Sequence, residues 1–228
     1  GGGKYFVIRG GSSIAAFSVG EEFHPGKGIR LLGAHTDSPV LAVKPQPDVK
    51  KEGLLQIGVE VYGGALLNPW FDRDLSVAGR VSFLERGKSL QSCLIDFSEP
   101  IAFIPSLAIH LDRDANNNRS VNSQKDILPI LMHLAGQSCM DFKSLLKEQV
   151  EQQHRLKEID QVLDYDLVPY DTQRASFVGR KQEFIASARL DNLLSCYSCL
   201  QAMLYSNFQY PSLLIFNDHE EVGSASNI

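Results

Sequence analysis

The pattern of apolar runs changes twice along the chain, and this change limits the fold more than any other feature. Residues 28–39, GIRLLGAHTDSP, form an apolar run that ends in polar residues and a proline, as a buried strand with functional groups at its carboxyl end does. After residue 184, a helical pattern at 191–205 precedes an apolar strand at 212–217. The alternation predicts an α/β fold with a mixed, largely parallel sheet flanked by helices.

The stretch between these segments, residues 40–183, has a different character. A charged segment within it, LLKEQVEQQHRLKEID at 145–160, carries enough Lys and Glu to form a solvated helix face. Three runs have the composition of β-strands, at 54–67, 75–85 and 89–97. We therefore expect a β-rich domain inserted into an α/β domain.

The first segment also contains a hairpin pattern. KYFVIRGGSSIAAFSVG at 4–20 has alternating apolar residues on both sides of a Gly-Gly-Ser-Ser turn. The expected organisation is thus a first part of the α/β domain at 1–39, the insertion at 40–183 and a truncated second part at 184–228. Because the first residue is Gly1 and the last apolar run ends soon after a predicted strand, we expect both ends to be cut.

Composition excludes several classes of partner. The formal net charge is -5, and no concentrated basic patch of the kind that binds a phosphate backbone is present. There is no run of about 18 apolar residues and no charged segment leading into an apolar stretch with a cleavage site. We expect neither nucleic acid nor a membrane as a partner.

The cysteines indicate a reducing compartment, which we interpret as the cytoplasm. Cys93, Cys139, Cys196 and Cys199 are few and irregularly spaced, unlike the dense frameworks of small secreted domains. The last two form C-x-x-C within a helical pattern, but no second Cys or His pair is available to complete a tetrahedral site. Two thiols on the surface or in the core of a helix are therefore favoured over a structural zinc or redox site.

Histidine and carboxylates gather in three short segments that are far apart in the sequence, at 33–39, 187–192 and 217–224. Each follows a predicted strand or begins a predicted helix. Open α/β sheets place their sites at such edges, because side chains from several strands converge there.

The first segment contains His35 and Asp37. In extended backbone, residues two apart point to the same face, so Asp37 can accept the second imidazole N–H and fix the tautomer of a metal-ligating histidine. A hydrogen-bonded turn is the alternative for this pair taken alone.

The third segment contains adjacent carboxylates, Glu220 and Glu221, directly after the apolar run SLLIF. Unpaired carboxylates in a partly buried setting are costly, so a positive group is expected nearby. One carboxylate on a metal ion and the other free as a general base is an arrangement that uses both. Two solvated glutamates at a helix N-terminus remain the alternative.

The second segment contains Asp191, between an apolar residue and a helical run. A helix-capping aspartate is one interpretation. The other is a carboxylate that bridges two metal ions, since paired ions a few Å apart need a shared ligand.

Together with YGGALLNPWFDRDLSVAGR at 62–80 and IPSLAIHLDR at 104–113, these segments resemble the aspartyl aminopeptidase family of cocatalytic zinc peptidases. Five motifs occur in the order found in that family, over nearly the whole chain. The resemblance implies a dinuclear zinc metallo-aminopeptidase, with Co²⁺ or Mn²⁺ as possible substitutes. It also implies that roughly the first tenth and roughly the last two fifths of such a protein are absent here.

The resemblance further implies roles for single residues. His35 would bind one zinc ion, Asp191 would bridge both ions and Glu221 would bind the other. Glu220 would act as the general base, and Asp37 would orient the histidine.

The family also has a β-rich dimerisation domain inserted in its peptidase domain, and its dimers assemble into a dodecamer. His110 matches a family histidine that reaches into the active site of a neighbouring subunit and contacts the substrate. An Asp and a His that complete the two zinc shells, and the basic residues that read an acidic substrate side chain, would lie beyond residue 228. With three of about five ligands, we expect the fragment alone to be inactive.

The expected function is hydrolysis of the N-terminal residue, Asp or Glu, from peptides. A carboxypeptidase or deacylase with the same dinuclear site is an alternative, because the specificity residues are missing. A non-catalytic assembly module is a third interpretation, against which the retained, costly pair of adjacent glutamates argues.

Overall fold

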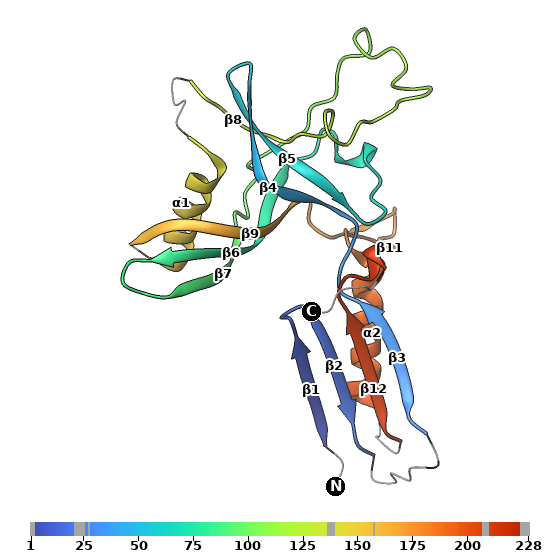
Figure 1. Ribbon diagram of the computed structural model, residues 1–228. Coiled ribbons are helices and arrows are strands. Elements are labelled where there is room, and N and C mark those ends of the chain that lie inside the picture. Colours follow the sequence, from blue (N-terminus) through green and yellow to red (C-terminus); the bar gives the residue numbers. More distant parts are fainter. Residues whose placement is uncertain are drawn as a thin grey trace. The chain divides into compact units, whose positions relative to one another are not determined.

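The computed structural model describes residues 3–20, 26, 28–135, 140–156, 158–206 and 210–223 (Figure 1). The chain divides into two compact units, one formed by residues 1–39 and 175–228 and the other by residues 40–174. The second unit ends before residue 183, where the sequence suggested a boundary. The intervening residues contain β10 (Ser176–Val178), which pairs with β11 (Phe184–Ala186) just ahead of the helix of the first unit.

The first unit is built on a four-stranded mixed sheet with the order β1-β2-β12-β3. Its strands are β1 (Lys4–Arg9), β2 (Ser13–Ser18), β12 (Ser212–Asn217) and β3 (Arg30–His35). β1 pairs with β2, and β2 with β12, in antiparallel fashion, whereas β12 and β3 are parallel. The predicted hairpin is confirmed, and parallel pairing among these strands is confined to β3 and β12.

One helix of the first unit packs against the parallel strands. This helix, α2 (Leu190–Tyr205), contacts β3 and β12. Met203 on the helix and Leu214 and Phe216 on β12 form a small core, with Cys196 partly buried against it. The α/β class expected from the sequence is therefore confirmed, as are the predicted helix and the predicted strand that follows it.

The second unit is predominantly β-structure and contains two three-stranded sheets, β4-β5-β8 and β7-β6-β9. The strands are β4 (Val40–Lys51), β5 (Leu54–Tyr62), β6 (Leu75–Glu85), β7 (Leu90–Asp96), β8 (Ile130–His133) and β9 (Ile159–Asp171). β5, β6 and β7 confirm the three predicted β-rich runs. A short 3-10 helix, η2 (Asn68–Trp70), lies between β5 and β6.

The sequence analysis missed the two longest strands, β4 and β9. β4 contains Pro45 and Pro47, and its pairing with β5 shifts register between Val43 and Asp48. A bulge tolerates prolines that a regular ladder would exclude, because the bulged residues do not donate to the neighbouring strand. The sequence signal for a strand is therefore interrupted where the strand itself continues.

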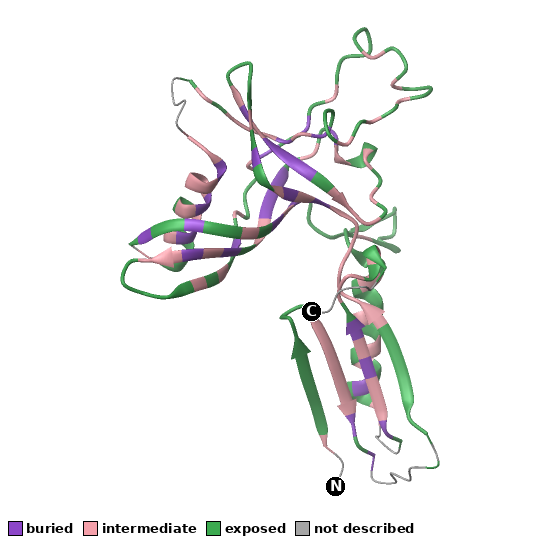
Figure 2. Ribbon diagram, in the orientation of Figure 1, coloured by how far each residue is buried: buried purple, intermediate pink, exposed green. Residues whose placement is uncertain are grey.

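A helix, α1 (Phe142–His154), packs on the second sheet of this unit. Phe142, Leu146 and Val150 recur every four residues and are fully buried. Along α1, buried positions lie among partly exposed ones (Figure 2). Asp141 caps the helix, because its carboxylate accepts the backbone N–H of Ser144 at 2.8 Å. The predicted helix is thus confirmed for residues 145–154, with a buried stripe on one face, whereas Ile159 and Asp160 belong to β9.

Within the ranges that the structure describes, no helix is both long enough and apolar enough to cross a membrane.

Candidate metal centre

The candidate site lies at the carboxyl edge of the two parallel strands, β3 and β12. His35 is the last residue of β3 and is in register with Asn217, the last residue of β12. Parallel strands present their carboxyl ends at one edge, so the segments that follow them emerge together. These are the segment after His35 and the 3-10 helix η3 (Glu220–Val222).

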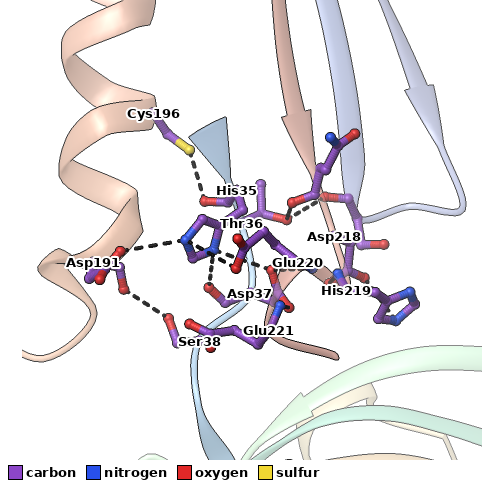
Figure 3. A network of polar contacts seen from close by, with 12 residues as sticks. His35, Thr36, Asp37, Ser38, Asp191, Cys196, Asp218, His219, Glu220 and Glu221 are labelled. Atoms are coloured by element: carbon purple, nitrogen blue, oxygen red, sulfur yellow. Dashed lines mark hydrogen bonds and ion pairs between the residues drawn. The ribbon is translucent and has the colours of Figure 1, made fainter. Parts of the chain in front are cut away.

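His35 is held in one orientation by Asp37. The Nδ1 atom of His35 lies 3.0 Å from the backbone carbonyl oxygen of Asp37 and 3.3 Å from its Oδ1 atom. A carbonyl oxygen can only accept a hydrogen bond, so Nδ1 carries the proton and donates a hydrogen bond to this carbonyl. The lone pair is then on Nε2, the nitrogen that faces the other carboxylates (Figure 3).

Asp37 also holds the turn that carries the two glutamates. Its Oδ1 accepts the backbone N–H of Glu220 at 3.2 Å, and its Oδ2 accepts that of Glu221 at 3.1 Å. One buried carboxylate, with 7% of its side chain exposed, thereby links the histidine to the glutamate pair. The hydrogen-bonded turn considered from the sequence is present, and it is part of the cluster.

Asp191 approaches His35 from the first turn of α2. Its Oδ1 atom lies 3.4 Å from Nε2 of His35, and its side chain is 85% exposed. Arg189 occupies the N-cap position and the backbone of Asp191 is not helical, so Asp191 is not the capping residue. Ser38 donates to the backbone carbonyl of Asp191 at 3.3 Å, which ties this turn to the segment after β3.

The cluster is rich in negative charge. Burial lowers the pKa of His35, but the hydrogen bond to the carbonyl of Asp37 and the charges of Glu220, Asp37 and Asp191 outweigh it and raise the pKa above its ordinary value. Across the described ranges, no Lys or Arg forms an ion pair with Asp191, Glu220 or Glu221. The polar groups of the cluster are therefore mainly anionic.

The donor atoms are close enough to share a metal ion. His35, Glu220 and Glu221 each offer one ligand atom, and these atoms all lie within 4.8 Å of one another. Zn–N and Zn–O bonds are about 2 Å long, so two ligands of one tetrahedral ion lie about 3.3 Å apart. The observed spread of up to 4.8 Å is wider, and side-chain rotation would have to close it when an ion binds. Imidazole nitrogen with carboxylate oxygens is a donor set that zinc accepts, and the residues therefore fit.

The remaining predicted residues lie elsewhere. His110 belongs to the second unit, where it is exposed on a turn between β7 and β8. Its apolar neighbours Leu107, Ile109 and Leu111 are themselves more than half exposed. Cys139 and Ser224 lie outside the described residues.

The C-x-x-C pair contains free thiols on α2, as expected. Cys196 has one feature that the sequence did not indicate: its Sγ lies 3.2 Å from the backbone carbonyl of His35, to which it donates. Burial raises the pKa of the Cys196 thiol, so the group remains protonated and able to donate.

Two further side chains at this edge were missed by sequence reasoning. Thr36 lies between the two predicted residues of the first segment, and Ser13 begins β2. Their hydroxyl groups bond to backbone atoms of Ser12, in the turn before β2, and of Asp218, just after β12. No sequence signal could have found them, because a hydroxyl at a strand end is common and its partner is decided by tertiary pairing.

Comparison with known proteins decides the family. The family model described as aminopeptidase I zinc metalloprotease (M18) matches residues 1–228. The chain belongs to the M18 family. The resemblance inferred from the motifs is thereby confirmed at the level of this family of zinc metalloproteases.

Curated M18 relatives are closely similar in sequence. The chain is 56% identical over 225 residues to a probable M18 family aminopeptidase 2 of Pseudomonas savastanoi pv. phaseolicola, a match that covers 99% of this chain and 52% of the relative. A protein of the same name from Pseudomonas fluorescens is also 56% identical, over 224 residues. The chain thus spans about half the length of the curated M18 relatives it matches.

Two solved structures have a similar fold. A cryo-EM structure of a complex of Ape4 and Nbr1 matches with a TM-score of 0.85 and 34% identity, covering 98% of this chain and 46% of that one. The Saccharomyces cerevisiae mApe1 dodecamer matches with a TM-score of 0.73 and 27% identity, covering 99% of this chain and 51% of that one.

Proposed function

We propose that the full-length protein is a dinuclear-zinc aminopeptidase whose catalytic cluster contains His35, Asp37, Asp191, Glu220 and Glu221. The observation that carries the proposal is the approach of His35 Nε2 to Asp191 Oδ1 at 3.4 Å and to Glu220 Oε2 at 3.9 Å. These residues come from segments separated by about 150 residues, yet they meet at one sheet edge. Membership of a zinc metalloprotease family supports the same conclusion.

Each residue has a role that its position supports. His35 Nε2 and Glu221 would hold one zinc ion each, and Asp191, which is exposed beside the histidine, would bridge the two ions. Asp37 would keep the imidazole in its tautomer, because Nδ1 donates to it. When bound, zinc supplies Lewis acidity, which polarises a peptide carbonyl and makes water more acidic.

Glu220 would be the general base. It neighbours a proposed ligand and lies near His35, but its side chain is 53% exposed, so a water molecule can reach it. It would accept a proton from the attacking water and deliver that proton to the leaving amine, the task of a carboxylate held near the reacting atoms. Glu220 also belongs to the three-residue donor group with His35 and Glu221. The zinc content of the Glu220→Gln and Glu221→Gln variants therefore distinguishes the base from the ligand.

The ligand set of this chain is incomplete for two ions. One histidine and two carboxylates, with Glu220 reserved as base, are fewer than two tetrahedral ions need, even with a shared ligand and water. We propose that an Asp and a His outside this sequence complete the shells. The chain by itself would then bind zinc weakly and would be inactive.

The proposed substrate is a peptide with a free N-terminal Asp or Glu, in accord with the resemblance to aspartyl aminopeptidases. The test is a panel of aminoacyl and N-acyl substrates presented to the full-length protein. We expect hydrolysis to require the free amine and to be fastest with Asp or Glu. Cleavage of N-acylated or C-terminal residues instead would favour a deacylase or carboxypeptidase, and no cleavage by zinc-loaded protein would favour an assembly module.

We further propose that residues 40–174 associate with a second copy and that the assembly is a dodecamer. The apolar side chains around His110 are exposed, with Leu107 62%, Ile109 54% and Leu111 66% accessible, and exposed apolar groups are typical of association surfaces. The similar mApe1 is described as a dodecamer. His110 would then contact the substrate in a neighbouring subunit. The three cysteines that the structure describes are free thiols, which suits a reducing compartment such as the cytoplasm.

A further inference from the structure

The β-ladder of the first unit ends at His35 and just before the two glutamates. The last pairs are Ile14 with Phe216 and His35 with Asn217. After the ladder, the N–H of Thr36 donates to the carbonyl of Asn217 at 2.8 Å, and regular backbone pairing stops. The glutamates follow three and four residues later, so something other than the sheet must fix their position.

Two hydroxyl groups continue the pairing where the backbone ladder stops. The Oγ1 of Thr36 donates to the carbonyl of Ser12 at 3.0 Å and lies 3.3 Å from the carbonyl of Asn217. The Oγ of Ser13 accepts the N–H of Asp218 at 2.9 Å. The turn of the hairpin is thus attached to the segment after β3 by one bond and to the segment after β12 by the other.

These bonds complete the hydrogen bonding of the turn that carries the glutamates. Asp218 N–H is bound by Ser13, and the N–H of His219 by the side chain of Asp218 at 2.8 Å. The N–H groups of Glu220 and Glu221 are bound by Asp37. Four successive N–H groups therefore have fixed acceptors, and the first of them depends on Ser13.

Thr36 acts on the segment that carries His35 and Asp37. It is the residue between His35 and Asp37, and its side chain is turned toward β12 and the hairpin (Figure 3). A shift of Thr36 would move the imidazole and the carboxylate that orients it together. The two hydroxyls thus act on the two halves of the cluster, one through the histidine segment and one through the glutamate segment.

We propose that Ser13 and Thr36 are positioning residues that set the separation between His35 and the glutamate pair, and that they thereby determine zinc affinity. The proposal rests on the proposed function in that it takes zinc as the ligand. Neither hydroxyl touches the ligand atoms, so each acts only through backbone. Residues that hold metal ligands in place are typically worth 10–100-fold in metal affinity.

The experiment measures zinc affinity of the full-length protein by competition with a chromophoric chelator. Thr36→Val keeps the shape of the side chain and removes its donor, and Ser13→Ala removes the acceptor. Thr36→Ser keeps the hydroxyl. Thr172→Val is the matched control, because Thr172 Oγ1 makes the same kind of bond, to the carbonyl of Asp74 at 3.0 Å in the second unit.

We expect Thr36→Val and Ser13→Ala to raise the zinc dissociation constant about 10-fold or more, and Thr36→Ser and Thr172→Val to leave it within about 2-fold. Melting temperatures of the metal-free proteins are compared in parallel, since bound zinc itself raises the melting temperature. If the Thr36 hydroxyl were merely structural, Thr36→Val and Thr172→Val would both have a lower melting temperature than the wild type, and their zinc affinity would be unchanged. That result would overturn the proposal.

The zinc affinities of the variants test the positioning role, whereas peptide hydrolysis tests the proposed function. Wild-type protein that binds zinc but releases no amino acid contradicts the proposed function, whereas the positioning role is still decided by the affinities of the variants. Equal zinc affinity of Thr36→Val and Thr36→Ser in an active enzyme overturns the positioning role alone. Should Ser13→Ala not fold, the two Thr36 variants decide the question.

Discussion

The Nδ1 atom of His35 lies 3.0 Å from the carbonyl oxygen of Asp37, and this contact leaves Nε2 free to face Asp191 and Glu220. The imidazole is not the only group that the carboxylate of Asp37 contacts. It also accepts the N–H groups of Glu220 and Glu221, so one residue holds both halves of the cluster.

Asp37→Asn should therefore weaken zinc binding. An amide offers one acceptor oxygen and would turn an NH₂ group toward one of the two backbone N–H groups, so one hydrogen bond is lost and two donors face each other. We expect zinc affinity to fall about 10- to 100-fold in chelator competition. Asp114→Asn, at an exposed position of the second unit, removes the same charge and serves as control; equal affinities in the two variants would contradict the role of Asp37.

Glu220 and Glu221 should respond differently to the same isosteric change. Glu220→Gln in the full-length enzyme should keep its zinc and lose about 10²- to 10⁴-fold in kcat, because a base is removed. Glu221→Gln should lose zinc, because a ligand is removed. Elemental analysis after dialysis measures the zinc content, and equal zinc loss in both variants would mean that the roles are reversed or shared.

His110 should act in a neighbouring subunit, where the imidazole would bind the substrate or stabilise the developing oxyanion. His110→Ala and Glu220→Gln subunits are each expected to be inactive as pure oligomers. When they are mixed under conditions that allow exchange, each mixed dimer should regain one competent site, and activity should rise above that of either parent. No rise despite exchange, measured by mass spectrometry of the mixed oligomers, would exclude the trans-acting role.

Asp141 should stabilise the fold in a pH-dependent way. Its hydrogen bond with the Ser144 side chain, followed by that with the Ser144 backbone, lowers the pKa of Asp141 despite partial burial. Since the folded-state pKa lies below the unfolded value, the stabilisation is present above about pH 4 and is lost as the pH falls through the folded-state pKa.

We accordingly expect Asp141→Ala to lower the free energy of unfolding by about 1 kcal/mol at pH 7 and by less near pH 3. Urea unfolding of both proteins at the two pH values measures the difference. Asp160→Ala, an exposed aspartate on β9, is the control. A loss for Asp141→Ala that is the same at both pH values would show that packing, rather than the charged cap, is responsible.

Much of the fold could be read from local patterns. The runs at 75–85 and 212–217 became β6 and β12 because they are rich in apolar and β-branched residues, which suit a pleated, partly buried strand. β4 could not be read in this way, because Pro45 and Pro47 are acceptable only where the register shifts opposite β5. The segment around His110 could not be read either, since apolar residues such as Leu107 and Leu111 indicate burial only when another element covers them, and both are exposed.

The sequence by itself determined which residues could perform chemistry: a histidine and four carboxylates at the ends of apolar runs. It could not determine how they are held, because side chains from segments about 180 residues apart meet only through the parallel pairing of β3 and β12. The tertiary structure alone decided that Asp37 joins His35 to the glutamates and that Ser13 and Thr36 continue the pairing beyond the strands. The physical reason is that each hydrogen bond has a partner chosen by register and distance, and neither is encoded in the local sequence.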